Sequence, residues 1–209
     1  MSRLVVKVCG LTNLEDARMA VAAGADWLGF VVKHDGPRAI QPAEARAIVR
    51  ALPVSVVVAV MVAPTPEEAL AIARETGALR VQLHRVDAST WPADFPLPAA
   101  FAVGVDEHGA LTAPAPPLPH LLMLDTSDAK LPGGTGRTFP WENAAPLARE
   151  RDLLLAGGLG PDNVAAAIEA VRPFGVDASS RLERMPGIKD PGLVLGYVSE
   201  ARRAGGATT

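Results

Sequence analysis

The sequence predicts an α/β protein that folds as one closed (β/α)8 barrel. Short β-branched apolar runs alternate with longer alanine-rich segments along the 209 residues. Continuous apolar runs of this kind are typical of parallel strands that are buried on both faces under crossover helices. Eight repeats of the unit favour closure into a barrel over an open sheet. We therefore expect residues 1–209 to form a single barrel domain.

The expected elements follow in order along the chain. The eight strand candidates are residues 4–9, 27–32, 55–62, 79–83, 100–105, 121–124, 153–155 and 175–178. Helix patterns occupy residues 14–23, 42–52, 66–76, 140–150, 161–171 and 193–203. Proline at a first helical position, as at Pro42 and Pro66, removes an N–H that would have no partner within the helix.

Two connections are crowded with proline, at residues 91–98 and 106–119. Proline in a helix interior removes a hydrogen bond and clashes with the preceding turn, so long helices are not expected there. The two segments could also be read as linkers between domains. Because the strand pattern resumes on either side, we interpret them as short connectors within one barrel.

Composition excludes several classes of partner. The chain is 49% hydrophobic and 21% charged, with a formal net charge of -3. It therefore lacks the basic field that attracts nucleic acid or an anionic membrane. Its apolar runs, such as residues 54–62, fall far short of the roughly 20 residues that span a bilayer. The single cysteine excludes an internal disulfide and the N-terminus has no secretory pattern, so we expect a cytoplasmic protein.

Cys9 and Asp125 each stand where an apolar run stops. The C-terminal ends of the strands surround the active site of such a barrel, so both side chains are expected at its mouth. Alone, Cys9 could be a small buried apolar residue, and Asp125 could be a turn or cap residue. Together they can serve as base and acid, because cationic surroundings can lower the pKa of a thiol while a carboxyl group donates a proton.

Two segments are candidates for binding a phosphate group. Gly157 and Gly158 leave the seventh strand, where glycine lets backbone N–H groups approach an anion. Ser179 and Ser180 follow the eighth strand and offer hydroxyl and backbone donors. A phosphate site between these two loops recurs in barrels of this architecture, whereas a glycine pair alone is more often a simple turn.

Other polar residues at the expected mouth are less specific. Residues 133–136 hold three glycines, including Gly134, and could form an active-site lid or only a flexible connection. Arg38 could bind a carboxylate through its two-pronged guanidinium, or be a solvated surface residue. His84 could be a donor in the pocket or a histidine satisfied at the rim.

Lys7 shares a strand face with Cys9, and we interpret it as a paired lysine inside the barrel, with a role in tuning the thiol as the alternative. Asp16 and Asp26 look like carboxylates of solvated helix faces or caps. No histidines or carboxylates have the spacing of metal ligands, so no metal is expected.

Short motifs in the same order and spacing resemble the phosphoribosylanthranilate isomerase family along nearly the whole chain. They are Lys7-Val8-Cys9-Gly10-Leu11-Thr12, Glu15-Asp16-Ala17, Gly24-Ala25-Asp26, Gly29-Phe30, Pro37-Arg38, Gln82-Leu83-His84, Leu124-Asp125-Thr126, Gly133-Gly134-Thr135-Gly136, Leu155-Ala156-Gly157-Gly158-Leu159, Pro161-Asp162-Asn163-Val164, Val176-Asp177, Ser179-Ser180, and Pro186-Gly187 with Lys189-Asp190.

The resemblance implies a TIM barrel of the ribulose-phosphate-binding type and an aldose-ketose isomerase of tryptophan biosynthesis. In that family the matching cysteine is the general base and the matching aspartate the general acid, roles that fall on Cys9 and Asp125. Arg38 matches the arginine associated with the anthranilate carboxylate. The implied reaction is an Amadori rearrangement of a small phosphorylated substrate that needs no cofactor. Either a monomer or a homodimer is compatible with the sequence.

Two residues depart from the family pattern, which usually has glycine where this chain has Arg85 and Arg181. Because Arg181 follows the serine pair, we expect it to assist phosphate binding or to flank that site. A similar dual-substrate sugar isomerase uses two aspartates, which Cys9 argues against. Indole-glycerol-phosphate synthase needs lysines that this mouth does not supply. A barrel that binds a phosphorylated ligand or a partner protein without catalysis is the remaining alternative.

Overall fold

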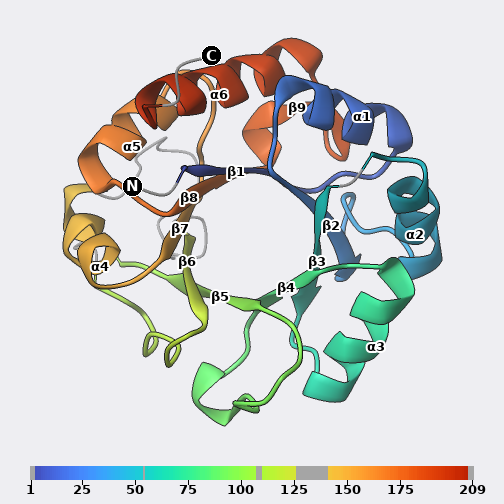
Figure 1. Cartoon of the computed structure of the whole chain (residues 1–209), viewed down its shortest axis with the longest axis horizontal. Coiled ribbons are helices and arrows are strands. Elements are labelled where there is room, and N and C mark those ends of the chain that lie inside the picture. The colour runs from blue at the N-terminus through green and yellow to red at the C-terminus, as the bar shows by residue number, and fades with distance from the viewer. Residues whose placement is uncertain (1–2, 54, 107–109, 126–140, 207–209) are drawn as a thin grey trace.

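Eight parallel strands form a closed barrel in the computed structural model, which describes residues 3–53, 55–106, 110–125 and 141–206. Each strand pairs with the next, and β8 pairs with β1 to close the sheet. The helices surround the strands as an outer ring (Figure 1). The strands are β1 Val5–Val8, β2 Trp27–Lys33, β3 Val56–Val62, β4 Arg80–His84, β5 Ala99–Gly104, β6 Leu121–Asp125, β7 Leu153–Ala156 and β8 Gly175–Ala178. The predicted (β/α)8 barrel is therefore confirmed.

The outer ring is regular at the start and end of the chain. Its helices are α1 Leu14–Ala23, α2 Pro42–Arg50, α3 Pro66–Thr76, α4 Ala145–Glu150, α5 Val164–Val171 and α6 Pro191–Ala204. The start of α3 shows how the sequence sets a boundary. The Thr65 side chain accepts a hydrogen bond from the Glu68 N–H, the Glu68 carboxylate accepts one from the Thr65 N–H, and Pro66 takes the first helical position.

The proline-rich connections behave as expected. A short 3-10 helix, η1 Ala88–Thr90, lies between β4 and β5, and the described residues between β5 and β6 hold no helix. Three expected helices are shorter than their patterns. The helix expected at 42–52 ends at Arg50. Within 140–150 the 3-10 helix η2 Trp141–Ala144 precedes α4, because Pro146 fits only the first turn of an α-helix. Within 161–171 the Asn163 side chain accepts from the Gly160 N–H and holds a turn, so α5 begins at Val164.

The core has two parts. The larger set of buried apolar side chains packs the strands against the helices. The smaller set comes from the other strand face, for example Val58 and Val60 of β3, and includes Cys9. Val60, Met123 and Ala156 of this smaller set also line the mouth of the barrel, which therefore rests on a packed interior.

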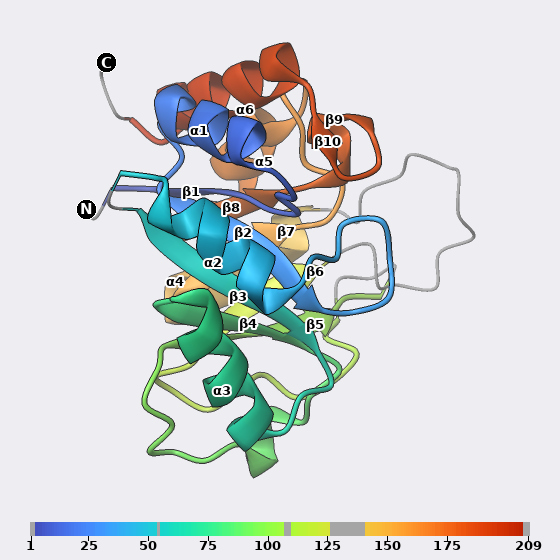
Figure 2. The same cartoon turned by 90° about the vertical axis from the view of Figure 1, so that its right-hand side faces the viewer.

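A small antiparallel hairpin, β9 Glu183–Met185 with β10 Ile188–Lys189, follows β8. Figure 2 shows both chain termini at one end of the barrel and this hairpin at the other. The hairpin was not predicted, since its few residues carry no strand pattern in the sequence. None of the helices in the described part of the chain is long and apolar enough to cross a membrane.

Two carboxylates expected on solvated faces or at caps instead connect separate elements of the fold. Asp26 accepts hydrogen bonds from the Val6 N–H at 2.8 Å and from Arg202 at 2.6 Å, so it connects β1 to α6. Asp16 is buried and accepts from the Lys189 N–H at 2.8 Å, which connects α1 to the hairpin. Helical periodicity gave the wrong environment because it does not reveal tertiary partners.

Gly29 of β2 lies against the base of the mouth, so we expect Gly29→Ala to destabilise the fold. An added Cβ would lie 2.8 Å from Cys9 Sγ and 3.1 Å from Cys9 Cα. Crowding of this kind in a packed interior costs about 1–3 kcal/mol. Urea unfolding followed by circular dichroism measures the change. Gly36→Ala, whose Cβ would come no closer than 3.4 Å to its nearest neighbour, is the matched control. A Gly29→Ala protein as stable as the unchanged chain would contradict the prediction.

Candidate active site

A cavity of about 400 Å³ opens at the C-terminal ends of the strands. Its volume suits a small-molecule ligand. The predicted site residues that line it are Cys9, Arg38, His84, Asp125, Gly157, Gly158, Ser179 and Ser180. The cavity therefore brings together the thiol, the carboxyl group and both candidate phosphate loops. Gly134 and the rest of the expected lid, residues 133–136, lie outside the described residues.

The Cys9 thiol is buried at the foot of this cavity, directly beyond β1. Burial raises the pKa of the thiol above its ordinary value, and the nearby Lys7 ammonium offsets only part of that rise. The sequence suggested the opposite direction, since it placed a cation near Cys9 without revealing how little water reaches the sulfur. The resting side chain is therefore mostly the neutral thiol at neutral pH.

Lys7 and Asp177 form a buried ion pair beside Cys9. The Lys7 Nζ lies 2.8 Å from Asp177 Oδ2, which confirms the expectation of a paired lysine inside the barrel. Burial alone would lower the pKa of Lys7, but Asp177 and Cys9 outweigh it and the pKa is raised. The Lys7 side chain therefore keeps its charge.

Asp177 is a residue of the site that sequence reasoning missed. It lines the cavity, and its Oδ1 atom is buried without a hydrogen-bond partner among the described residues. A buried carboxylate oxygen left unsatisfied is costly, so this atom is suited to accept a hydrogen bond from a ligand. An aspartate in the middle of an otherwise apolar strand was the signal that could have found it.

The two candidate phosphate loops meet on one wall of the cavity. Gly157 and Gly158 have φ angles of 87° and 68°, a conformation that side chains other than glycine rarely adopt. Ser179 and Ser180 follow β8 on the adjacent loop. Backbone and hydroxyl donors from both loops can therefore converge on an anion.

Arg181 flanks this wall rather than lining the cavity. Its guanidinium donates to the Gly158 carbonyl oxygen at 3.0 Å and to both Asp162 oxygens at 2.9 and 2.7 Å. The hydrogen bond from Arg181 holds the pKa of the Asp162 carboxyl below its usual value. Arg181 thus connects the loop after β8 to the loop after β7.

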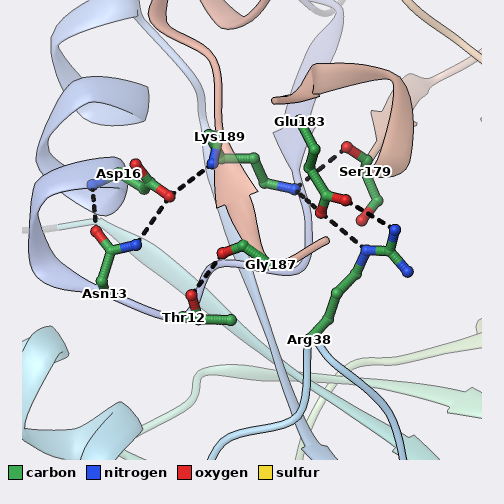
Figure 3. A network of polar contacts seen from close by, with 8 residues as sticks. All are labelled: Thr12, Asn13, Asp16, Arg38, Ser179, Glu183, Gly187 and Lys189. Carbon is green, nitrogen blue, oxygen red and sulfur yellow. Dashed lines mark hydrogen bonds and ion pairs between the residues drawn. The ribbon is translucent and has the colours of Figure 1, made fainter. Parts of the chain in front are cut away.

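Arg38 enters the cavity from the connection between β2 and α2, and it is held by a residue that the sequence did not single out. Its Nε and Nη2 atoms donate to the two carboxylate oxygens of Glu183, at 2.8 and 2.7 Å (Figure 3). Arg38 also packs close to Gly10, where an added Cβ would lie 2.9 Å from Arg38 Cδ. Its side chain therefore lies next to the segment that carries Cys9.

The end of β4 contributes His84, and the next residue along the chain is Arg85. The His84 Nε2 and Gln82 Nε2 atoms are 2.9 Å apart, so the ring has a polar neighbour within the cavity. Arg85 also lines the cavity and has a φ of 54°, a left-handed conformation that glycine adopts without strain. The backbone therefore keeps a turn suited to glycine although the side chain is arginine.

Comparison with known proteins identifies the family. Residues 6–200 match the model of the N-(5'phosphoribosyl)anthranilate (PRA) isomerase family. The chain belongs to this isomerase family. A relative named N-(5'-phosphoribosyl)anthranilate isomerase, from Desulforudis audaxviator, is 43% identical over 203 residues, which cover 96% of this chain and 98% of the relative.

Solved structures of PRA isomerases share the fold. A Thermotoga maritima structure, of monomers generated from a dimeric phosphoribosylanthranilate isomerase, has a TM-score of 0.80 at 34% identity and covers 96% of this chain and 99% of that one. Another PRA isomerase, in complex with reduced 1-(o-carboxyphenylamino)-1-deoxyribulose 5-phosphate, has a TM-score of 0.78 at 33% identity with the same coverage. The family and its barrel thus agree with the geometry of the site.

The Lys7–Asp177 ion pair beside Cys9 leads to a testable prediction about the pKa of the thiol. We expect the Cys9 thiolate to form at a higher pH than in a free cysteine, because burial penalises the charged form. Lys7→Met should move the midpoint to still higher pH, because the ammonium that stabilises the thiolate is lost. Since Cys9 is the one cysteine in the sequence, ultraviolet absorbance of the thiolate reports on it alone.

Lys33→Met removes a more exposed lysine that pairs with Glu68 outside the cavity, and it serves as the control. Its titration should match that of the unchanged chain. A Lys7→Met midpoint at or below that of the unchanged chain would contradict the assigned role of Lys7.

Proposed function

We propose that this chain converts N-(5-phosphoribosyl)anthranilate to 1-(2-carboxyphenylamino)-1-deoxyribulose 5-phosphate, an Amadori rearrangement of tryptophan biosynthesis. One observation carries the proposal: Cys9 and Asp125 line the same cavity, whose wall also holds the two candidate phosphate loops. The family membership and the product-like compound bound by a PRA isomerase support it. A reaction of this kind needs an acid and a base on one sugar, which this cavity supplies.

The substrate would be held at its two anionic ends. Gly157, Gly158, Ser179 and Ser180 would bind the phosphate through backbone N–H and hydroxyl groups. Arg38 would bind the anthranilate carboxylate. Fixing both ends places the sugar between them, where the acid and base lie.

The chemistry moves protons and electron pairs within one molecule. Asp125 protonates the furanose ring oxygen while the nitrogen lone pair forms a C=N bond, which breaks the bond from C1 to the ring oxygen and gives an open-chain iminium ion. The Cys9 thiolate then takes the proton from C2, the electrons of that C–H bond form the C1=C2 bond of an enolamine, and the electron pair of the C=N bond returns to the nitrogen. Tautomerisation gives the ketone. Atoms and electrons are conserved, so no cofactor takes part.

Lys7 and Asp177 support the base in this scheme. The Lys7 ammonium stabilises the thiolate electrostatically, and the raised pKa makes Cys9 a stronger base once it has lost its proton. The buried Oδ1 atom of Asp177, which has no hydrogen-bond partner among the described residues, would accept a hydrogen bond from a sugar hydroxyl. His84 would donate to the substrate from the opposite wall.

The remaining expectations complete the proposal. Residues 1–209 would act as one catalytic domain in the cytoplasm, on a small phosphorylated molecule and without nucleic acid or membrane. The chain would work as a monomer or a homodimer; the Thermotoga maritima relative is described as dimeric.

Removing either proton-transfer group should nearly abolish turnover. We expect Cys9→Ala and Asp125→Asn each to lower kcat by roughly 10²- to 10⁴-fold with a small change in KM, because these groups act mainly in the transition state. The decrease in anthranilate fluorescence, with substrate generated in situ, measures the rate. Near-normal kcat in either variant would rule out the role assigned to that residue.

Arg181→Gly tests the wall beside the phosphate loops. Loss of the hydrogen bond to the Gly158 carbonyl should raise KM by about two- to tenfold and leave kcat nearly unchanged, since the pair with Asp162 is largely exposed and screened by salt. Steady-state kinetics at two ionic strengths measure both constants. Arg203→Gln, which breaks an exposed pair with Glu200, is the control. A KM that stays the same at every ionic strength would show that Arg181 has no part in phosphate binding.

A further inference from the structure

We propose that the β9–β10 hairpin is a positioning element that fixes Arg38, and that this makes the site selective for aromatic amines that carry a carboxylate. The inference rests on the proposed function, because it assigns the amine end of the substrate to Arg38. Glu183 and Lys189 are the positioning residues.

The carboxylate of Glu183 is engaged at both oxygens. Oε1 accepts from Arg38 Nε and from Lys189 Nζ, each at 2.8 Å, and Oε2 accepts from Arg38 Nη2 at 2.7 Å. The Glu183 and Lys189 side chains are 4% and 0% exposed, whereas Arg38 is 31% exposed toward solvent. A two-pronged contact with a buried carboxylate fixes both the place and the plane of the guanidinium.

The three side chains carry a surplus of positive charge. Arg38 and Lys189 contribute two positive charges and Glu183 one negative charge, so the cluster is left with one positive charge. Arg38 is the member that lines the cavity, and its Nη1 group lies outside the contact with Glu183. A buried cluster with a net charge is stabilised when a ligand of opposite charge completes it. The cluster therefore suits an anionic group at this wall.

The hairpin is itself tied to the barrel. The Lys189 N–H donates to Asp16 of α1 at 2.8 Å, and Thr12 Oγ1 donates to the Gly187 carbonyl oxygen at 2.6 Å (Figure 3). Gly187 has a φ of 84°, and an added Cβ would lie 2.6 Å from the Pro37 carbonyl oxygen. The hairpin thus lies close to the backbone of Pro37, the residue directly before Arg38, and it contacts Arg38 itself through the Glu183 side chain.

A fixed guanidinium gives selectivity for a carboxylate in two ways. The long arginine side chain loses little further freedom when the ligand binds, so more of the interaction appears as affinity. An amine without the carboxylate leaves the fixed positive charge without its partner, and sites built to hydrogen-bond a group discriminate strongly against ligands that lack it. Arg38 packs beside Gly10, the residue directly after Cys9, so an amine held by Arg38 would lie near the thiol.

The experiment compares two substrates on each protein. N-(5-phosphoribosyl)anthranilate and its counterpart made with aniline are both generated in situ from ribose 5-phosphate and the free amine. The readout is the ratio of kcat/KM for the first substrate to that for the second. Both substrates meet the same folded molecules, so the ratio does not depend on how much of a variant folds.

The double variant Glu183→Gln/Lys189→Gln separates position from charge, because it keeps one net positive charge in the cluster. We expect the ratio to fall by about tenfold or more, the range of a charge-assisted two-pronged contact. Glu183→Gln alone raises the net charge, so an effect of charge only would raise the ratio, whereas loss of position lowers it. Glu200→Gln, in an exposed pair with Arg203, is the control and should leave the ratio unchanged.

The inference would be overturned if the double variant had the same ratio of kcat/KM values as the unchanged chain. It would also be overturned if Glu183→Gln had a higher ratio than the unchanged chain. If neither variant yields folded protein, Thr12→Val decides the matter, because it removes the hydrogen bond to Gly187 without touching the buried charges. It should lower the ratio in the same direction, and an unchanged ratio would again overturn the inference. Failure of the unchanged chain to convert the anthranilate substrate would instead refute the proposed function.

Discussion

The Lys7–Asp177 ion pair is the interaction on which the arrangement of the mouth depends. The two residues face each other across the seam where β1 and β8 close the barrel, in register as Cα partners. Removing one member of a buried ion pair costs about 3–5 kcal/mol, because the other charge is left uncompensated. A slip of either strand by one residue would also turn its member of the pair to the opposite face of the sheet, away from its partner. The seam is therefore locked in the one register that places Cys9 at the foot of the cavity.

From that seam the charged groups extend outward in two directions. On one side Lys7 of the ion pair lies beside Cys9. On the other side Glu183 of the β9–β10 hairpin contacts both Arg38 and Lys189. Both arrangements follow the same physical rule, that a buried charge is retained when partners surround it. The barrel supplies rigid strand ends, and the hairpin after β8 supplies the Glu183 carboxylate that holds Arg38 in place.

The sequence predicted the barrel and the members of the mouth, because both depend on local patterns. Apolar runs located the strands, and the strand ends located Cys9, Asp125 and the glycine pair. Glu183 was missed because a three-residue strand carries no periodic signal. Asp16 was misread as solvated because helical spacing does not show that the hairpin covers it.

Electrostatic properties were harder to predict than positions. The direction of the Cys9 pKa shift depends on burial, which is a property of the whole fold, while the sequence revealed only the nearby lysine. Arg181 shows the same limit, since its partner Asp162 lies on another loop, 19 residues away in sequence. Where a side chain points depends on contacts between segments that are far apart in the chain.

The burial of Cys9 also protects the protein between catalytic cycles. Oxidants and electrophiles attack the thiolate form of cysteine, and they require access to the sulfur. Cys9, the sole thiol of the chain, is 6% exposed and mostly protonated, so it presents little thiolate to such reagents. The burial that makes the sulfur a strong proton acceptor once it is ionised therefore also lowers its reactivity toward peroxide and alkylating agents.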